Sequence, residues 1–209
     1  MATHEAIEQM TMLHSGTNSG MITVGVLLFD EVEELDFAGP WEVFGIASQH
    51  EKLKVLTVSK DGQLVSCRWG LRVQPNHSFA TCPRLDLLIV PGGRGAREKA
   101  RYDPETITFI RKHASQSPIV SVCTGALVLA QADILDGKKA TTHAALMNAL
   151  REYPKVQVVE GERFVFQGNV ATSGGISAGI DISLELLKQK YGEDLVKKVV
   201  EEMEYRYSP

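Results

Sequence analysis

The stretch PIVSVCTGALVLA, residues 118–130, decides the fold. Its first half is rich in β-branched apolar residues, as in a strand buried on both faces, and its second half has the composition of a buried helix. A single cysteine, Cys123, lies at the junction between the two halves. The stretch therefore predicts a strand over 118–123 and a helix over 124–135, joined by a sharp turn.

The same alternation continues along the chain in both directions. Apolar runs at 21–29, 53–59 and 85–93 predict further buried strands. Helices are expected to begin near Pro40 and at Asp103, because proline suits the first turn of a helix and aspartate can cap it. Strands that alternate with helices predict an α/β sandwich with a mostly parallel sheet.

The remaining segments fit the same architecture. Short alternating pieces in residues 62–79 predict an antiparallel ribbon or edge strands. Residues 142–153 predict a helix with Thr142 as its cap, and further strands and two closing helices follow. Residues 21–209 are therefore interpreted as one domain. Residues 1–20 are polar and are expected to form a disordered or loosely docked extension.

The composition is ordinary for a globular protein and argues against several classes of partner. Of the 209 residues, 44% are apolar and 23% are charged, with a formal net charge of -4. Such a chain predicts no nucleic-acid partner and no anionic membrane partner. No apolar run approaches the ~20 residues that span a bilayer, and the first residues lack the pattern of a secretory signal.

The three cysteines, Cys67, Cys82 and Cys123, include no CxxC pair. An odd number without such a pair argues against a disulfide framework or a zinc site. The sequence therefore predicts a reducing, cytoplasmic location and no metal. Cys67 and Cys82 are interpreted as small, buried structural residues.

Three turns that follow predicted strands carry the candidate chemistry: FDEVEELD, VPGGRG and SVCTGA. In open α/β sheets the functional crevice lies at the carboxyl ends of the strands, so the three turns are expected to converge. The glycine turn lacks both common phosphate-binding patterns. Its glycines could direct backbone N–H groups toward a developing negative charge, or they could simply allow a tight turn.

Cys123 is the candidate nucleophile. A strand-to-helix elbow strains the backbone and lifts the side chain out of the sheet, and Gly125 allows the helix to pack closely. The start of a helix is also expected to favour the thiolate and lower the pKa of the thiol. The alternative interpretation of Cys123 is a small buried apolar residue.

A nucleophilic cysteine usually needs a proton acceptor, and two candidates are available. His143 could approach the crevice, but it could equally cap its helix or face solvent. The second candidate lies in the acidic cluster at residues 31–36, most of which is expected to be solvated. Asp36, flanked by two apolar residues, is expected to point inward, where burial and a neighbouring thiolate would raise its pKa. It could then hold and donate a proton.

Three separated segments, LLIVPGGRG, SVCTGALVLAQADILDGKKATTH and TSGGISAGID, together resemble the ThiJ/PfpI superfamily. This is the flavodoxin-like group that includes the parkinsonism-associated deglycase, and the resemblance covers residues 21–205. The segments LLFDEVEELDFAGPWEVF and VCTGALVLA look closest to the isocyanide hydratase branch. Related domains also occur in AraC-type regulators, joined to a helix-turn-helix module.

The resemblance implies a flavodoxin-like α/β/α sandwich and a cysteine enzyme. By this resemblance Cys123 is the nucleophile, Asp36 the acid and base, and Thr124 a residue that lines the site. Gly93 would lend a backbone donor. The reaction implied is the addition of water to an isocyanide to give an N-substituted formamide, with no metal or organic cofactor. A homodimer is also implied.

Other site residues and other functions remain open at this point. Arg94 and His143 are further candidates for binding substrate. Protease-like members place a histidine after the cysteine, where this chain has Thr124, and deglycase-like members use glutamate where it has Asp36. The alternatives are a cysteine-based stress or redox sensor, a glyoxalase or deglycase-type enzyme, and a ligand-binding regulatory domain.

Overall fold

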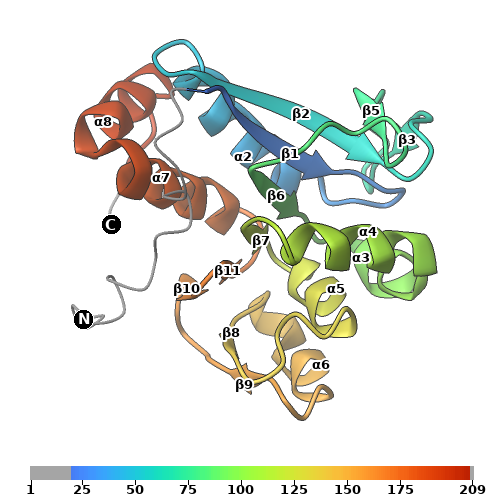
Figure 1. The fold of residues 1–209 in the computed structure, drawn as a ribbon. Coiled ribbons are helices and arrows are strands. Elements are labelled where there is room, and N and C mark those ends of the chain that lie inside the picture. The colour runs from blue at the N-terminus through green and yellow to red at the C-terminus, as the bar shows by residue number, and fades with distance from the viewer. Residues whose placement is uncertain (1–19, 208–209) are drawn as a thin grey trace.

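The computed structural model describes residues 20–207, so the predicted N-terminal extension lies almost wholly outside the described residues. Its main sheet has seven strands in the order β10-β11-β7-β6-β1-β2-β5 (Figure 1). These are β1 (Ile22–Leu27), β2 (Leu53–Ser59), β5 (His77–Ser78), β6 (Leu87–Val90), β7 (Ile119–Ser121), β10 (Phe164–Gln167) and β11 (Val170–Ser173). Every neighbouring pair is parallel except β10–β11.

The order of the parallel strands is that of a flavodoxin-like fold. Counted along the chain, β1, β2, β6, β7 and β11 are the first to fifth long parallel strands, and in the sheet they lie in the order 2-1-3-4-5. From β1 the chain moves to β2 on one side of it and then crosses back to β6 on the other side, so the strand order reverses between the neighbours β1 and β6. A crevice at their carboxyl ends is where such folds place ligands. The predicted fold class is confirmed.

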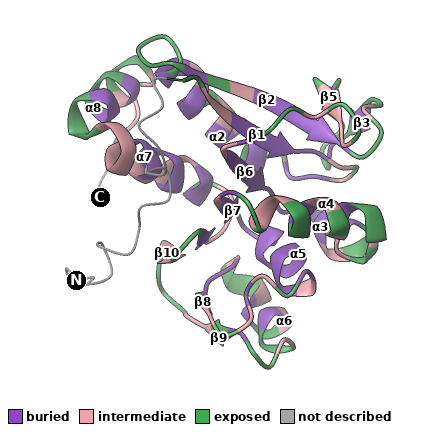
Figure 2. Ribbon diagram, in the orientation of Figure 1, coloured by how far each residue is buried: buried purple, intermediate pink, exposed green. Residues whose placement is uncertain are grey.

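Two layers of helices enclose the sheet (Figure 1). On one side lie α2 (Glu34–Ala47), α7 (Ala178–Tyr191) and α8 (Glu193–Glu202). On the other side lie α3 (Arg94–Glu98), the 3-10 helix η1 (Ala100–Tyr102), α4 (Pro104–Ala114), α5 (Gly125–Gln131) and α6 (Met147–Arg151). Figure 2 shows that the inward surfaces of both layers are buried.

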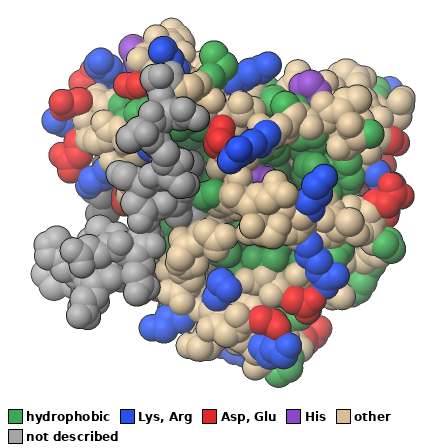
Figure 3. Space-filling view, in the orientation of Figure 1, with side chains coloured by type: hydrophobic (Ala, Val, Ile, Leu, Met, Phe, Trp, Pro, Cys, Tyr) green, Lys and Arg blue, Asp and Glu red, His purple; other side chains and the backbone are tan. Residues whose placement is uncertain are grey.

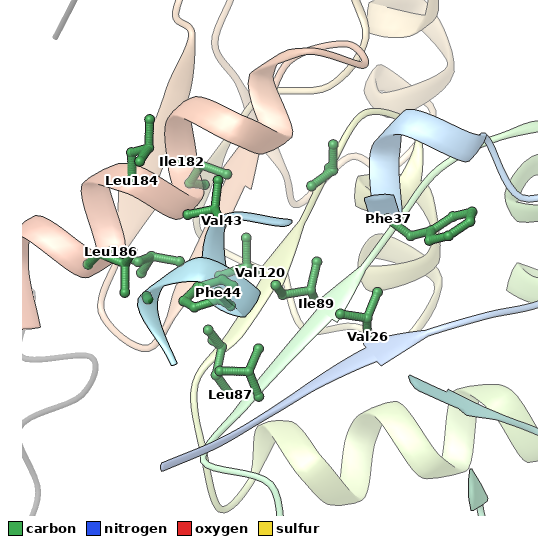
Figure 4. Packing of buried hydrophobic residues seen from close by; sticks show 14 of the residues in the cluster. Val26, Phe37, Val43, Phe44, Leu87, Ile89, Val120, Ile182, Leu184 and Leu186 are labelled. Carbon is green, nitrogen blue, oxygen red and sulfur yellow. The ribbon is translucent and has the colours of Figure 1, made fainter. Parts of the chain in front are cut away.

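Each layer packs on its own apolar core because both faces of the central strands are apolar. The first core includes Phe44 of α2, Ile182 of α7 and Ile89 of β6 (Figure 4). The second core joins β6 and β7 to α4 and α5. Charged side chains of both signs are interspersed on the face in Figure 3, in keeping with the small net charge. Within residues 20–207, no helix has the length and apolar character needed to cross a membrane.

The short strands between residues 65 and 78 agree with the antiparallel ribbon and edge strands predicted for residues 62–79. β3 (Val65–Ser66) and β4 (Arg72–Val73) pair antiparallel, and β5 joins the edge of the main sheet. A second small pair, β8 (Lys139–Ala140) with β9 (Gln157–Val158), is parallel. The ribbon contacts the loop that follows β1: the N–H of Glu31 donates to Ser66 O at 2.8 Å.

Three helix starts differ in how well the sequence predicts them. Asp103 caps α4 by accepting from the Thr106 N–H at 3.0 Å, as predicted. Pro40 lies inside α2 rather than near its start, and since proline has no N–H, the Asp36 carbonyl has no helical donor there. Thr142 does not cap the following helix. His143 does, through Nδ1, which accepts from the Ala145 N–H before the 3-10 turn η2 (Ala144–Leu146).

Candidate active site

Three loops meet at the carboxyl edge of the sheet, as the sequence predicts. The loop after β1 leads to Asp36 in the first turn of α2, a glycine turn follows β6, and Cys123 lies two residues after the end of β7. The first two loops are hydrogen-bonded to each other: the Glu33 N–H donates to Gly92 O at 3.1 Å, and the Gly95 N–H to Glu31 O at 2.9 Å. These bonds bring the first turn of α2 close to the glycine turn.

The glycines permit this convergence because their neighbours leave no room for a side chain. A Cβ on Gly92 would lie 2.5 Å from the Thr124 nitrogen, and one on Gly93 would lie 2.4 Å from the Glu33 nitrogen. Gly93 also has a φ of 118°, a conformation that favours glycine. A Cβ on Gly125 would lie 2.1 Å from the Val90 carbonyl oxygen, which confirms the predicted close packing of α5.

Cys123 sits on a strained bend that its neighbours hold in place. Its φ is 56°, an uncommon value for a residue with a side chain. Its N–H donates to Gly174 O at 3.0 Å, and its carbonyl accepts from the Thr142 hydroxyl at 2.8 Å. The residue is 5% exposed, so it is buried rather than on the surface.

Asp36 is fully buried and only partly satisfied. Its Oδ2 accepts from the Gly92 N–H at 2.9 Å, whereas its Oδ1 has no hydrogen-bond partner. Burial raises its pKa from 3.8 to about 7, assisted by the negative charge of Glu33 and opposed by the Gly92 N–H, Cys123 and Arg68. The inward carboxyl with a raised pKa agrees with the sequence-based expectation. Near neutral pH such a group can both accept and donate a proton.

The thiol of Cys123 behaves differently from the prediction. Burial and the charge of Asp36 raise its pKa from 9.0 to about 12, and the N–H groups of Ile176 and Thr124 offset this only in part. The predicted lowering of the pKa is wrong. The reason is that water is excluded from the sulfur and that the Asp36 carboxyl lies beside it. At neutral pH the unliganded site therefore holds a protonated thiol beside a carboxyl that can take its proton.

Thr124 and Gly93 are bonded to each other. The Gly93 N–H donates to Thr124 Oγ1 at 3.0 Å, so this donor is engaged rather than offered to a ligand. The donors that act on the sulfur are instead the N–H groups of Thr124 and Ile176. Ile176 was not anticipated. It has a φ of 46°, and the only sequence feature that could have pointed to it is the pair of glycines that precedes it.

The other two predicted site residues are placed differently. His143 is half-buried, and its ring packs against the loop after β11: a Cβ on Gly175 would lie 2.4 Å from the ring. It is thus near the cysteine loop. Arg94 is mostly exposed, and its Nε donates to Glu98 at 2.8 Å along α3, so its side chain is not brought into the group. The binding roles of both residues stay predictions.

Glu33 is a residue that sequence reasoning misjudged. It was expected to be solvated, but it is 6% exposed and accepts hydrogen bonds from Arg68 at 2.6 Å and from the Trp69 indole N–H at 3.0 Å. Both partners come from the turn of the β3–β4 ribbon, 35 and 36 positions away, so no local pattern could reveal them. Within residues 20–207, no group of three or more His, Cys, Asp or Glu side chains is placed to hold a metal ion.

Comparison with known proteins places this fold and site in a family. Residues 22–189 match the DJ-1/PfpI family. An isonitrile hydratase of Pseudomonas putida is 41% identical over 189 residues, which cover 90% of this chain and 80% of that protein. The HTH-type transcriptional regulator GbdR of Pseudomonas aeruginosa is 30% identical over 86% of this chain, which spans 49% of the regulator.

Solved structures agree with these relatives. A ThiJ/PfpI family protein from Pseudomonas syringae matches with a TM-score of 0.82 at 30% identity, covering 91% of this chain and 77% of that one. Drosophila melanogaster DJ-1beta, at 22% identity, shares the fold with a TM-score of 0.80, covering 90% of this chain and 100% of that one. On the match of 168 consecutive residues, 22 to 189, and on the relative at 41% identity, this chain belongs to the DJ-1/PfpI family.

Proposed function

We propose that this protein adds water to an isocyanide to give an N-substituted formamide. The observation that carries the proposal is the buried pair at the carboxyl edge of the sheet: the Cys123 thiol beside Asp36, whose pKa is raised to about 7. The identity of 41% to an isonitrile hydratase supports it. The burial of the cysteine also supports it, because Cys123 is 5% exposed and the reacting carbon of an isocyanide is terminal and unsubstituted.

The first half of the reaction forms a covalent intermediate. The Asp36 carboxylate accepts the thiol proton, and a sulfur lone pair forms a bond to the terminal carbon of the isocyanide. The lone pair on that carbon then takes the proton from Asp36. The product is a thioimidate, R–N=CH–S, on Cys123, and Asp36 is again a carboxylate.

The second half adds water and releases the cysteine. Water attacks the thioimidate carbon and loses a proton to Asp36, and the C=N electron pair moves to nitrogen, which takes that proton. The C–S bond of the resulting tetrahedral adduct then breaks. Its electron pair returns to sulfur, the hydroxyl proton passes through Asp36 to the thiolate, and the formamide leaves. The net change is the addition of one water molecule, without oxidation or reduction.

The test is turnover of an alkyl and an aryl isocyanide, followed by proton NMR of the formamide. Wild type should turn over, Cys123→Ala should not, and Asp36→Asn should lose about 10²–10⁴-fold in kcat. Cys82→Ala is the matched control, because that half-buried thiol lies outside the crevice, against the Pro83 carbonyl. An inactive wild type, or full activity of Cys123→Ala, contradicts the proposal.

A redox sensor is less well supported by the same site. Oxidation of cysteine proceeds through the thiolate, and a pKa of about 12 keeps Cys123 protonated at neutral pH. Isocyanide hydration avoids this difficulty, because Asp36 removes the proton as the sulfur reacts.

We also expect a homodimer. The β3–β4 ribbon and its approaches expose the large apolar side chains of Leu64 (49%), Trp69 (72%) and Leu71 (51%), which a second copy could cover. Sedimentation equilibrium measures this directly: a monomeric mass at micromolar concentration contradicts it.

A further inference from the structure

Glu33 is a buried carboxylate at the start of the helix that carries Asp36. It is the N-cap residue of α2, and Asp36 is the third residue of that helix. One oxygen of Glu33 accepts from Arg68 at 2.6 Å and the other from the Trp69 indole N–H at 3.0 Å. Residues three apart in a helical turn lie on the same side, so Glu33 and Asp36 are neighbours inside the protein.

The cluster of Glu33, Arg68 and Trp69 is held from several directions. The Arg68 guanidinium lies 4.9 Å from the centre of the Trp69 ring, and the backbone N–H of Trp69 donates to Glu34 Oε1 at 2.7 Å. The Arg68 N–H donates to Val32 O at 3.0 Å. These contacts fix a negative and a positive charge at set positions beside the active-site loop.

Stability alone gives a weak reason for such a pair. The Arg68 side chain is 35% exposed, so the pair is only partly removed from water, and ion pairs exposed to water add little to stability. A fixed charge beside a reactive carboxyl has a further effect, because it changes the ease with which that carboxyl holds a proton. The charged and titratable groups that act on Asp36 are Glu33, Arg68 and Cys123.

We propose that Glu33 and Arg68 are positioning residues that set how tightly Asp36 holds its proton. The Glu33 carboxylate favours the protonated form of Asp36, and Arg68 limits this effect while holding Glu33 in place. The consequence of this proton affinity for catalysis rests on the proposed function, in which Asp36 must both take and return a proton. The charge effect itself does not depend on the substrate.

The test titrates Asp36 directly. Protein labelled with carbon-13 at the aspartate carboxyl carbon is followed by NMR from pH 4 to 9, and the Asp36 resonance is identified by its absence in Asp36→Asn. Removing the negative charge with Glu33→Gln should lower the Asp36 midpoint by about one pH unit. Removing the positive charge with Arg68→Gln should raise it by about half a unit or more. Shifts of opposite sign are not expected from simple loosening of the loop.

Two controls complete the design. Arg68→Lys keeps the charge and should return the midpoint to near the wild-type value. Glu193→Gln removes an equal charge from an exposed pair with Lys188 and should leave the midpoint unchanged. Midpoints that stay at the wild-type value in both Glu33→Gln and Arg68→Gln, or that move in the same direction, overturn the inference. Because the readout is the carboxyl carbon, this result is separate from whether isocyanides are turned over.

Discussion

The Gly92 N–H donates to Asp36 Oδ2 at 2.9 Å, while Oδ1 of the same carboxyl has no partner within the described residues. A buried carboxylate usually needs several donors to stay ionised, and here one backbone donor serves it. Burial therefore dominates, and the carboxyl is poised between its two protonation states near neutral pH. The glycine turn leaves one oxygen of Asp36 available for proton transfer.

This arrangement predicts a pH-dependent stability. The pKa of Asp36 is raised in the folded state, from 3.8 to about 7, so the folded protein holds a proton that the unfolded chain releases. Stability should therefore fall as pH rises from about 4 to about 7 and level off above that, by up to about 4 kcal/mol in total.

The measurement is the free energy of unfolding in urea, for wild type and Asp36→Asn, across pH 4 to 9. The difference between them isolates Asp36, because other titrating groups are shared. The variant should gain stability relative to wild type as pH rises through this window. A difference that is independent of pH contradicts the raised pKa.

Much of the fold is predictable because it depends on local patterns. Buried parallel strands such as β6 read as continuous apolar runs, and Asp103 marks the start of α4. In place of the single helix expected over 142–153 the structure has η2 followed by α6, and Thr142 does not act as a cap because its hydroxyl donates to the carbonyl of Cys123. A contact between residues 19 positions apart thus overrides a local preference.

The site divides in the same way. Asp36 and Cys123 could be found because each follows a strand end that the periodicity already locates. The direction of the Cys123 pKa could not, since it depends on burial and on the neighbouring carboxyl rather than on helix position. The ion pair between Glu33 and Arg68 joins segments 35 positions apart, and neither segment has a local sequence pattern that indicates it.

Thr142 should prove important to the strained bend. Thr142→Val removes the hydroxyl that donates to the Cys123 carbonyl and leaves that buried oxygen without this donor, which should cost about 1–3 kcal/mol of unfolding free energy. Thr142→Ser keeps the donor and should lose less than half as much. Urea denaturation of the two variants makes the comparison. A loss in Thr142→Ser as large as that in Thr142→Val would contradict the prediction, because serine keeps the hydroxyl and lacks only the methyl group.

Gly125 should tolerate no side chain. Gly125→Ala would place a Cβ 2.1 Å from the carbonyl oxygen of Val90, a backbone atom in β6, so the helix or the strand must shift at a cost of about 1–3 kcal/mol. Gly45→Ala is the matched control, because Gly45 lies inside α2 with nothing within 4 Å of the new Cβ. It should stabilise the protein by about 0.5–1 kcal/mol. Thermal unfolding of the pair should therefore give shifts of opposite sign, and a stabilised Gly125→Ala would contradict the packing described here.

Asp36 should also suppress the reactivity of Cys123. After burial, the negative charge of Asp36 is the largest effect that raises the pKa of the thiol, so Asp36→Asn should lower that pKa and increase the thiolate fraction. A decrease of about one pKa unit would make Cys123 react about tenfold faster with iodoacetamide at pH 9. Mass spectrometry of the alkylated peptides reports each cysteine separately, and Cys82 serves as an internal reference because burial alone raises its pKa, to about 11. Slower alkylation of Cys123 in the variant, with alkylation of Cys82 unchanged, would contradict this prediction and show that Asp36 favours the thiolate. The first step of the proposed reaction would then begin from a thiolate that is already formed.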